Sequence, residues 1–298
     1  MWLLIPALTA CKNSRDLRSS ELGTDDTGSL ADDSGLADDT GPLRDLDRSL
    51  HFNAMGHLEV EIDDPSNVQP GGPADVGSRD FTIEFWLKAA LEDNTANFVE
   101  CGNNTAWDQG NLLVDATRFD RSRGFGASLT GNTVVFGTVL NGQAMSLCGA
   151  FDVLDEEWHH VAIERRASNG QLFLFIDGGI QAVAKGPAGD LSYPDDESPS
   201  GSADPFLVFG AEKHGLGLGY TGYMDEIRIS TKLRYEASFD PQITPFSPDG
   251  QTAVLWHLDN GEGLFVEDEA VLDDSPTEGS LILHGQPPAP TWSDEHAL

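Results

Sequence analysis

Apolar and polar residues alternate in short stretches from residue 49 to the end of the chain, and turn-forming residues separate these stretches. The clearest example spans residues 158–184. An Asn-Gly pair at 169–170 and an Asp-Gly pair at 177–178 divide it, and both pairs favour two-residue hairpin loops. Residues 172–176 are apolar on both faces, a pattern typical of a central strand covered on each side. The stretch predicts a three-stranded antiparallel meander inside a large β-protein.

The same alternation predicts further strands on either side of the meander. Leu58, Val60 and Ile62 alternate with acidic residues, which predicts a half-buried strand with an acidic outer face. Other strands are expected at residues 50–53, 81–89, 97–101, 111–116, 125–129, 133–140, 144–148 and 224–229. Short strands that recur between turns are typical of a β-sandwich. We therefore predict an all-β fold of two antiparallel sheets.

Four groups of segments follow one another along the chain: LHFN (50–53) with LEV (58–60), FTIEFWL (81–87), WHHVA (158–162) with LFIDG (174–178), and GYMDEIRI (222–229). Taken in this order, they resemble the laminin-G-like (LamG) jelly roll of the concanavalin A-like lectin/glucanase superfamily. The resemblance covers most of residues 49–298 and implies a two-sheet antiparallel jelly-roll domain over that range. It implies little about function, because this fold carries glycan binders, protein binders and hydrolases.

The C-terminal fifth of the chain has an unusual position for its sequence. Residues 252–263 and 280–285 resemble a segment that many members of this family carry before their first core strand. Here the segment either closes the same sandwich by a permuted route or begins a second copy of the domain. We expect closure, because a stub would leave Trp256 and the apolar residues 281–283 without a core, and domain termini often lie close together.

The N-terminus resembles the signal peptide of a bacterial lipoprotein. An apolar run at residues 2–10 ends in Leu8-Thr9-Ala10-Cys11, which is similar to a lipobox. No Lys or Arg precedes the run, so either the start codon lies upstream or the signal is unusually short; a chance apolar N-terminus is the alternative. We expect residues 1–11 to be the signal and Cys11 to be lipidated. The protein would then be anchored at the cell envelope, in the outer membrane, or be secreted.

Residues 12–48 are expected to form a disordered acidic linker behind that anchor. The units DDTG, DDSG and DDTG at 25–28, 32–35 and 38–41 repeat one theme with almost no apolar content. Such a segment cannot bury enough apolar surface to offset the entropy lost on ordering, and its charges repel each other. The spacing of its Asp pairs is not that of an EF-hand calcium loop, so we interpret it as a solvated spacer.

The charge of the whole chain narrows the range of partners. The formal net charge is −33, whereas nucleic-acid binding requires a basic surface. A charge of this size keeps an exported protein soluble and attracts cations. We expect a glycan or an extracellular protein as partner, no nucleic acid, and contact with the membrane through the lipid anchor alone.

The three cysteines, Cys11, Cys101 and Cys148, suggest one disulfide. If Cys11 is lipidated, Cys101 and Cys148 remain in an oxidising compartment, each near a strand end and followed by Gly. We predict that these two form a disulfide. Two independent buried thiols are the alternative.

Because the superfamily includes glucanases, paired carboxylates were the first candidates for catalysis. Glu59, Glu61 and Asp63 share one face of a predicted strand, but Pro65 occupies the position of the third acid in a motif similar to Glu-x-Asp-x-Glu. We interpret the three acids as an outer face that discourages edge-to-edge pairing. We expect a non-enzyme without catalytic residues.

Asp225 is the carboxylate that we single out as a metal ligand. In a regular strand it shares a face with Ile227 and Ile229, and a carboxylate on an apolar face must be hydrogen-bonded or bound to a cation. In LamG-like jelly rolls an acid at this point can join a calcium site with a nearby loop, which implies Asp273 or Asp274 here. The hypothesis is one structural Ca²⁺. A carboxylate that accepts backbone N–H bonds is the alternative.

The function that we expect is a non-catalytic, surface-anchored recognition module for carbohydrate or protein. A glycoside hydrolase or lyase of the same superfamily and a purely structural envelope protein are the alternatives. Aromatic rings stack on sugar faces, so solvent-facing aromatics are the candidate ligand contacts, with core packing as the default for each. These candidates are Trp107, Tyr193, Tyr220 and Tyr223.

Overall fold

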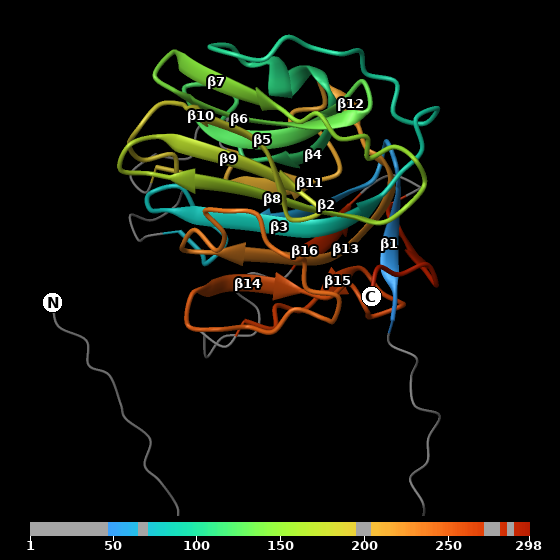
Figure 1. Ribbon diagram of the computed structural model, residues 1–298. Coiled ribbons are helices and arrows are strands. Elements are labelled where there is room, and N and C mark those ends of the chain that lie inside the picture. The colour runs from blue at the N-terminus through green and yellow to red at the C-terminus, as the bar shows by residue number, and fades with distance from the viewer. Residues whose placement is uncertain (1–46, 65–70, 195–203, 271–280, 285–288) are drawn as a thin grey trace, which may run out of the picture. The chain divides into compact units, whose positions relative to one another are not determined.

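The computed structural model describes residues 47–64, 71–194, 204–270, 281–284 and 289–298. These residues form two β-sheets that pack face to face as a sandwich (Figure 1). The strand pairing is antiparallel except for one short parallel pair, and the helical content of the described residues is one 3₁₀ helix, η1 (Ala106–Gln109). The all-β, two-sheet prediction is confirmed.

Sheet A contains the predicted meander at one edge, and the first and last strands of the domain at the other edge. Its strand order is β10 (Gly179–Lys185), β9 (Gln171–Ile176), β8 (His159–Arg166), β3 (Phe81–Lys88), β13 (Thr221–Ser230), β1 (Ser49–Asn53) and β17 (Thr291–Ser293), and β14 (Thr252–Trp256) also pairs with β13.

Sheet B begins with C-terminal strands and ends with a second meander. Its order is β15 (Phe265–Val266), β16 (Leu281–His284), β2 (His57–Glu61), β11 (Phe206–Phe209), β4 (Asn111–Asp115), β5 (Arg123–Thr130), β6 (Thr133–Leu140) and β7 (Gln143–Cys148), and β12 (Leu218–Gly219) pairs in parallel with β4.

Strand β9 shows why a strand that is apolar on both faces belongs inside the protein. Leu172 and Leu174 point into the core between the two sheets, whereas Phe173 and Phe175 point outward. The segment that follows β13 covers these outward rings and buries them. In this segment the ring of Tyr235 stacks on Phe239 and contacts Phe175. The segment thus forms a partial third layer over sheet A.

The C-terminal segment closes the same sandwich. β14 pairs with the second half of β13, β16 pairs with β2, and β17 pairs with β1. Trp256 and Leu281 are buried in the main core, and the C-terminus lies beside β1 (Figure 1). Closure was therefore the correct alternative.

One predicted strand is wrong, and its segment has another role. Residues 97–101 are irregular. The next residue, Gly102, forms an isolated bridge with Ser146 of β7. A disulfide joins Cys101 to Cys148, with the two Cα atoms 5.7 Å apart, as the cysteine count suggested. The disulfide holds the segment against the outer face of sheet B, where Val99 packs beside it instead of pairing as a strand.

Candidate functional site

The outer face of sheet A carries a row of half-exposed rings, which we call the aromatic strip. His51 of β1, Tyr223 of β13 and Trp158, just before β8, contribute the rings. His51 lies opposite Tyr223 in the strand register, and the two ring centroids are 4.6 Å apart. The Trp158 centroid lies 6.3 Å from that of Tyr223. Tyr223 faces outward because its neighbour Met224 is in the core, and side chains alternate along a strand.

Charged groups flank the aromatic strip. Lys88 of β3 lies opposite Tyr223 in the register, and its Nζ donates a hydrogen bond of 2.9 Å to Glu295. This hydrogen bond raises the pKa of Lys88, so the ammonium group is charged at neutral pH. Burial lowers the pKa of His51, so its ring is neutral there. The strip thus offers neutral rings with a cation and a carboxylate beside them.

The other three candidate aromatics, Trp107, Tyr193 and Tyr220, are buried, so the default of core packing is correct for them and they do not face solvent. Trp107 has 1% of its surface exposed because its indole lies on two glycines of sheet B. A Cβ at Gly126 or Gly137 would come within 2.4 Å or 1.8 Å of the indole, respectively. The glycines therefore form a slot for Trp107, which anchors η1 to the sheet.

Tyr220 and Tyr193 are also structural. The Tyr220 hydroxyl donates to the carbonyl oxygens of Tyr223 and Lys88, at 2.8 and 3.1 Å, so it holds the backbone beneath the aromatic strip. The Tyr193 hydroxyl is 3.3 Å from an oxygen of Asp204.

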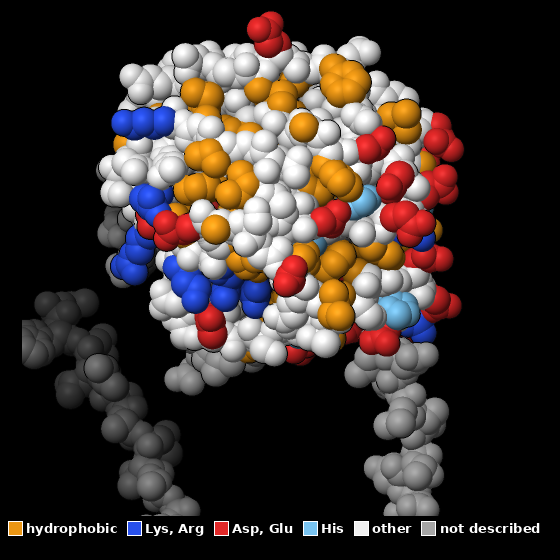
Figure 2. All heavy atoms as spheres, in the orientation of Figure 1, with side chains coloured by type: hydrophobic (Ala, Val, Ile, Leu, Met, Phe, Trp, Pro, Cys, Tyr) orange, Lys and Arg blue, Asp and Glu red, His pale blue; other side chains and the backbone are white. Residues whose placement is uncertain are grey.

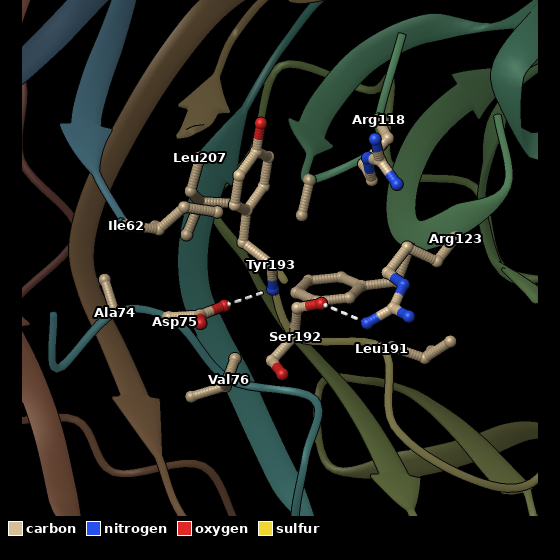
Figure 3. A pocket seen from close by; sticks show the side chains of 12 residues that line it. Ile62, Ala74, Asp75, Val76, Arg118, Arg123, Leu191, Ser192, Tyr193 and Leu207 are labelled. Atoms are coloured by element: carbon tan, nitrogen blue, oxygen red, sulfur yellow. Dashed lines mark hydrogen bonds between the residues drawn. The ribbon is translucent and has the colours of Figure 1, made fainter. Parts of the chain in front are cut away.

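Tyr193 lines a small pocket at the rim of the sandwich (Figure 3). Its backbone N–H donates to Asp75 at 2.9 Å, and Arg123 donates to the Ser192 carbonyl oxygen at 3.1 Å. The pocket volume is about 10 Å³, which admits one water molecule but no sugar. We interpret the pocket as a packing defect and not as a ligand site.

Asp225 lies on the opposite face from the one that a regular strand predicts. A β-bulge between Asp225 and Arg228 shifts the register, and Glu226 has a left-handed φ of 50°. Asp225 therefore pairs with Trp86, whose side chain packs on the outer face of sheet A, while Ile227 remains in the core. The bulge was not evident from residue periodicity.

Both carboxyl oxygens of Asp225 accept backbone hydrogen bonds. Oδ1 accepts from the N–H of Glu226 at 2.9 Å, and Oδ2 accepts from the N–H of Ala297 at 2.8 Å. Burial, together with the nearby carboxylates of Glu226 and Asp259, raises the pKa of Asp225 to about 8. Asp225 thus ties the C-terminal residues to sheet A. Asp273 and Asp274, its proposed partners for calcium, lie outside the described residues, as does Cys11.

A basic hollow lies beside the segment that covers sheet A. Figure 2 shows Lys and Arg side chains gathered on one side of the face in view and acidic side chains on the other. The hollow has a volume of about 390 Å³, and Arg228, Lys232 and Arg234 line it. Arg228 forms an ion pair of 2.9 Å with buried Glu84, and Arg234 one of 3.1 Å with Asp249. These pairs hold the covering segment in place, so the basic charge is largely compensated.

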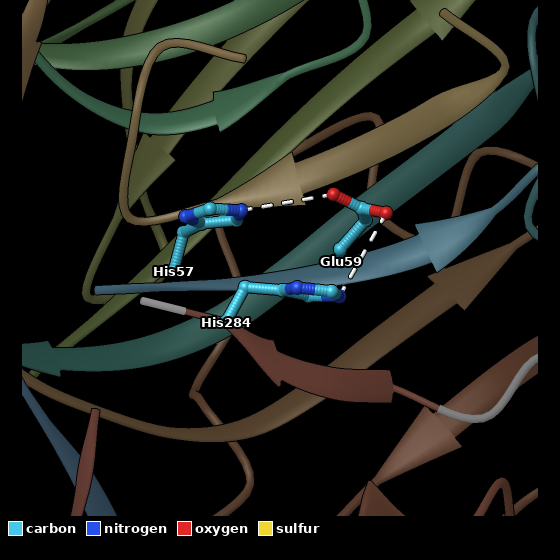
Figure 4. Close-up of side chains that lie close together, drawn as sticks. All are labelled: His57, Glu59 and His284. Carbon is cyan, nitrogen blue, oxygen red and sulfur yellow. Dashed lines mark ion pairs between the residues drawn. The ribbon is translucent and has the colours of Figure 1, made fainter. Parts of the chain in front are cut away.

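The predicted acidic face of β2 is only partly correct. Glu59 and Glu61 are on the outer face of sheet B, but Asp63 lies beyond the end of the strand and is buried. Glu59 instead lies beside two stacked histidines, His57 of the same strand and His284 of β16 (Figure 4). This cluster was missed because 225 residues separate His284 from Glu59, and the pairing of β16 with β2 could not be predicted.

A second cluster of carboxylates and histidine occupies the loop end of β4. Asp115, Glu212 and His214 lie close together, and His214 also contacts Asp204 at 2.6 Å. Although burial lowers it, the hydrogen bonds with Asp204 and Glu212 raise the pKa of His214 overall. Glu212 accepts the backbone N–H groups of His214 and Leu216, and Asp115 accepts that of Lys213. The polar groups satisfy one another, which indicates a structural role for the loop.

Comparisons with known proteins agree with this architecture. A laminin G family model of the concanavalin A-like lectin/glucanases superfamily matches residues 63–238. Comparison with curated proteins finds no match. Within the described residues, no helix is both long enough and apolar enough to cross a membrane.

Among solved structures, a Bacteroides ovatus protein provisionally described as carbohydrate binding is similar over 83% of this chain and 59% of its own length, with 13% identity and a TM-score of 0.52. The chain thus spans about three fifths of that protein. Domains LG4-5 of mouse laminin α1 match 62% of this chain and 42% of theirs, with 14% identity and a TM-score of 0.42. The first likeness shows a shared fold.

Proposed function

Because the chain belongs to the concanavalin A-like lectin/glucanases superfamily, we propose that its β-sandwich is a non-catalytic recognition module that binds carbohydrate. The aromatic strip of His51, Tyr223 and Trp158 is the observation that carries this proposal. It is a row of neutral rings on an outer sheet face, with the Lys88–Glu295 pair at its edge to hydrogen-bond hydroxyl groups. Aromatic rings beside a few polar groups suit the apolar faces and the hydroxyl groups of a sugar.

The contacts of several acids favour binding over hydrolysis. Glycoside hydrolysis needs two carboxyl groups that flank one open site, about 5–9.5 Å apart. Of the three predicted acids, Asp63 is buried and Glu59 lies beside two histidines, whereas Glu61 remains exposed on the outer face. Asp225 and Glu84 are also buried and hydrogen-bonded to protein groups.

A glycan array with the wild-type protein and two variants tests the proposal. Tyr223→Ala removes the central ring of the strip and should reduce binding about fivefold or more, if stacking of a sugar on one ring contributes at least about 1 kcal/mol, as base stacking on an aromatic side chain does. Phe265→Ala removes a ring that is 59% exposed on β15 and should bind as the wild type does. Equal binding by wild type and Tyr223→Ala would contradict the assignment, and release of reducing sugar from a bound polysaccharide would favour the hydrolase.

The location of the module is a separate part of the proposal. We propose that Cys11 carries a lipid and that residues 12–48 act as a spacer between the envelope and the sandwich. The lipobox-like sequence and the acidic composition support this. The wild-type protein should fractionate with membranes of a Gram-negative host, and Cys11→Ala should release or mislocalise it. Recovery of wild type from the soluble cytoplasm would contradict the anchor.

A further inference from the structure

Three ligand-type side chains converge on the outer face of sheet B (Figure 4). His57 and Glu59 face the same side of β2, because they are two residues apart on one strand. His284 lies opposite His57 in the register of β16 with β2. The two imidazole rings stack with centroids 5.4 Å apart and an interplanar angle of 12°. Strand pairing thus brings both rings to the same side of one carboxylate.

The nitrogen atoms of both rings are directed at this carboxylate. Nε2 of His57 is 3.6 Å from Oε2 of Glu59, and Nε2 of His284 is 3.8 Å from Oε1. Both separations are too long for hydrogen bonds. Nε2 of His284 is buried and has no hydrogen-bond partner among the described residues. A polar atom that is shielded from solvent and has no partner needs an explanation, and a bound ion is one that fits the geometry here.

The spacing suits a transition-metal ion. The three ligand atoms lie within 4.8 Å of one another. Ligands at about 2.0–2.2 Å from a tetrahedral Zn²⁺ are about 3.3 Å apart, so small side-chain rotations would bring these atoms into position. Two imidazoles with one carboxylate suit zinc and its neighbours, whereas Ca²⁺ and Mg²⁺ prefer oxygen ligands alone.

The surroundings also favour a cation. Three more acidic residues, Glu61, Asp63 and Asp64, follow Glu59 closely along the chain. Negative charge is therefore crowded at this end of the face, and a divalent ion would relieve it. With three protein ligands, one coordination position remains for water or for a group of a partner.

We propose that His57, Glu59 and His284 form a binding site for a divalent transition-metal ion of the Zn²⁺ class. The ion links β16 to β2 and so fastens the C-terminal part of the chain to sheet B. The site goes beyond carbohydrate recognition and does not depend on it, because its residues are on the other sheet from the aromatic strip.

Metal titration of the chelator-treated full chain tests the site. Zn²⁺ should bind with a stoichiometry of one by calorimetry, and Co²⁺ should give the visible absorption of imidazole coordination. His284→Gln and Glu59→Gln should each weaken binding at least tenfold. The matched controls are His296→Gln, an exposed histidine elsewhere, and Glu61→Gln, the next outward acid on β2; both should keep binding of one ion per chain.

The melting temperature gives a second measurement. A ligand that binds the folded state alone stabilises it, so Zn²⁺ should raise the melting temperature of wild type and both controls but not of His284→Gln. The wild-type protein must itself bind Zn²⁺ and show the Co²⁺ absorption. The proposal can therefore be refuted even if a variant folds poorly. Absence of stoichiometric binding by wild type, or equal binding by wild type and His284→Gln, would overturn it.

Discussion

At the residue scale, single side chains determine which surfaces are available for binding. Trp107 and Tyr223 are both large aromatic residues. Trp107 is buried, whereas Tyr223 lines the candidate site. The difference arises from Gly126 and Gly137, which lie on neighbouring strands and leave room for the indole. Tyr223 has no such slot, because its register partners are His51 and Lys88.

Asp225 makes the stability of the protein depend on pH. Its folded pKa of about 8 is above the unfolded value near 3.8, so the folded state holds a proton that the unfolded state releases. Stability should therefore fall as pH rises from about 4 to 8 and level off above that range, with a slope of up to about 1.4 kcal/mol per pH unit. Melting temperatures between pH 5 and 9 measure this.

The variant Asp225→Asn isolates this effect. Asn does not titrate, so the variant should show a flatter decline of melting temperature with pH, although it loses one acceptor of the two backbone hydrogen bonds. Raised pKa values of His159 and His257 add slope of the same sign above pH 6.5, so some decline should remain. Glu92→Gln, which changes an exposed acid, is the control. An unchanged slope in Asp225→Asn would refute the assignment.

At the scale of elements, the strands with clear alternation of apolar and polar residues were predictable. The irregular segments that pack on the outer faces of the sheets were not. β8 to β10 have strong periodicity and two hairpin pairs, so sequence alone located them. β11 was missed because FLVF is short, without alternation, and follows a long loop. Phe98, Val99 and Cys101 predict a strand at residues 97–101, but Val99 and Cys101 pack on the outer face of sheet B without strand pairing, and Phe98 is exposed.

The candidate site was predictable only in part, for a related reason. Tyr223 was identified, but its partners His51 and Trp158 come from distant segments, and only the pairing of β1 with β13 reveals them. The bulge at Glu226 follows from backbone geometry and packing that residue periodicity does not encode.

The disulfide that holds residues 97–101 against the outer face of sheet B gives a prediction at this scale. Cys101 and Cys148 are 47 residues apart in the sequence, so the bond should stabilise the protein by about 4 kcal/mol in the chain-entropy model. The double variant with Cys101→Ser and Cys148→Ser should melt at a markedly lower temperature. Alkylation should add mass at these cysteines only after reduction; equal masses with and without reduction would exclude the bond.

At the scale of the whole molecule, the C-terminal segment joins both sheets, and a calcium ion would strengthen that attachment. We propose that Asp225 with Asp273 or Asp274 holds one structural Ca²⁺. Adding Ca²⁺ to a chelated sample should then raise the melting temperature by the linkage of binding to folding. The increase should be larger at high pH, because the ion competes with the proton on Asp225.

Mg²⁺ at equal ionic strength separates this calcium effect from general screening of a chain with a net charge of −33. Asp225→Asn should abolish the increase, and Glu92→Gln should keep it. If Ca²⁺ and Mg²⁺ shift the melting temperature equally and Asp225→Asn behaves as wild type, there is no calcium site. Asp225 then serves only as an acceptor of backbone hydrogen bonds.

The pairing of the first sandwich strand with the last constrains the order in which this protein can fold. β1 finds its two neighbours in β13 and β17, about 170 and 240 residues later in the sequence, so a ribosome must make nearly the whole domain before sheet A can be completed. Contacts between such distant segments slow folding, because a long loop must close before the contacts can form. The hairpins of β8 to β10 close short loops and should form first. We therefore expect slow, post-translational completion of the sandwich.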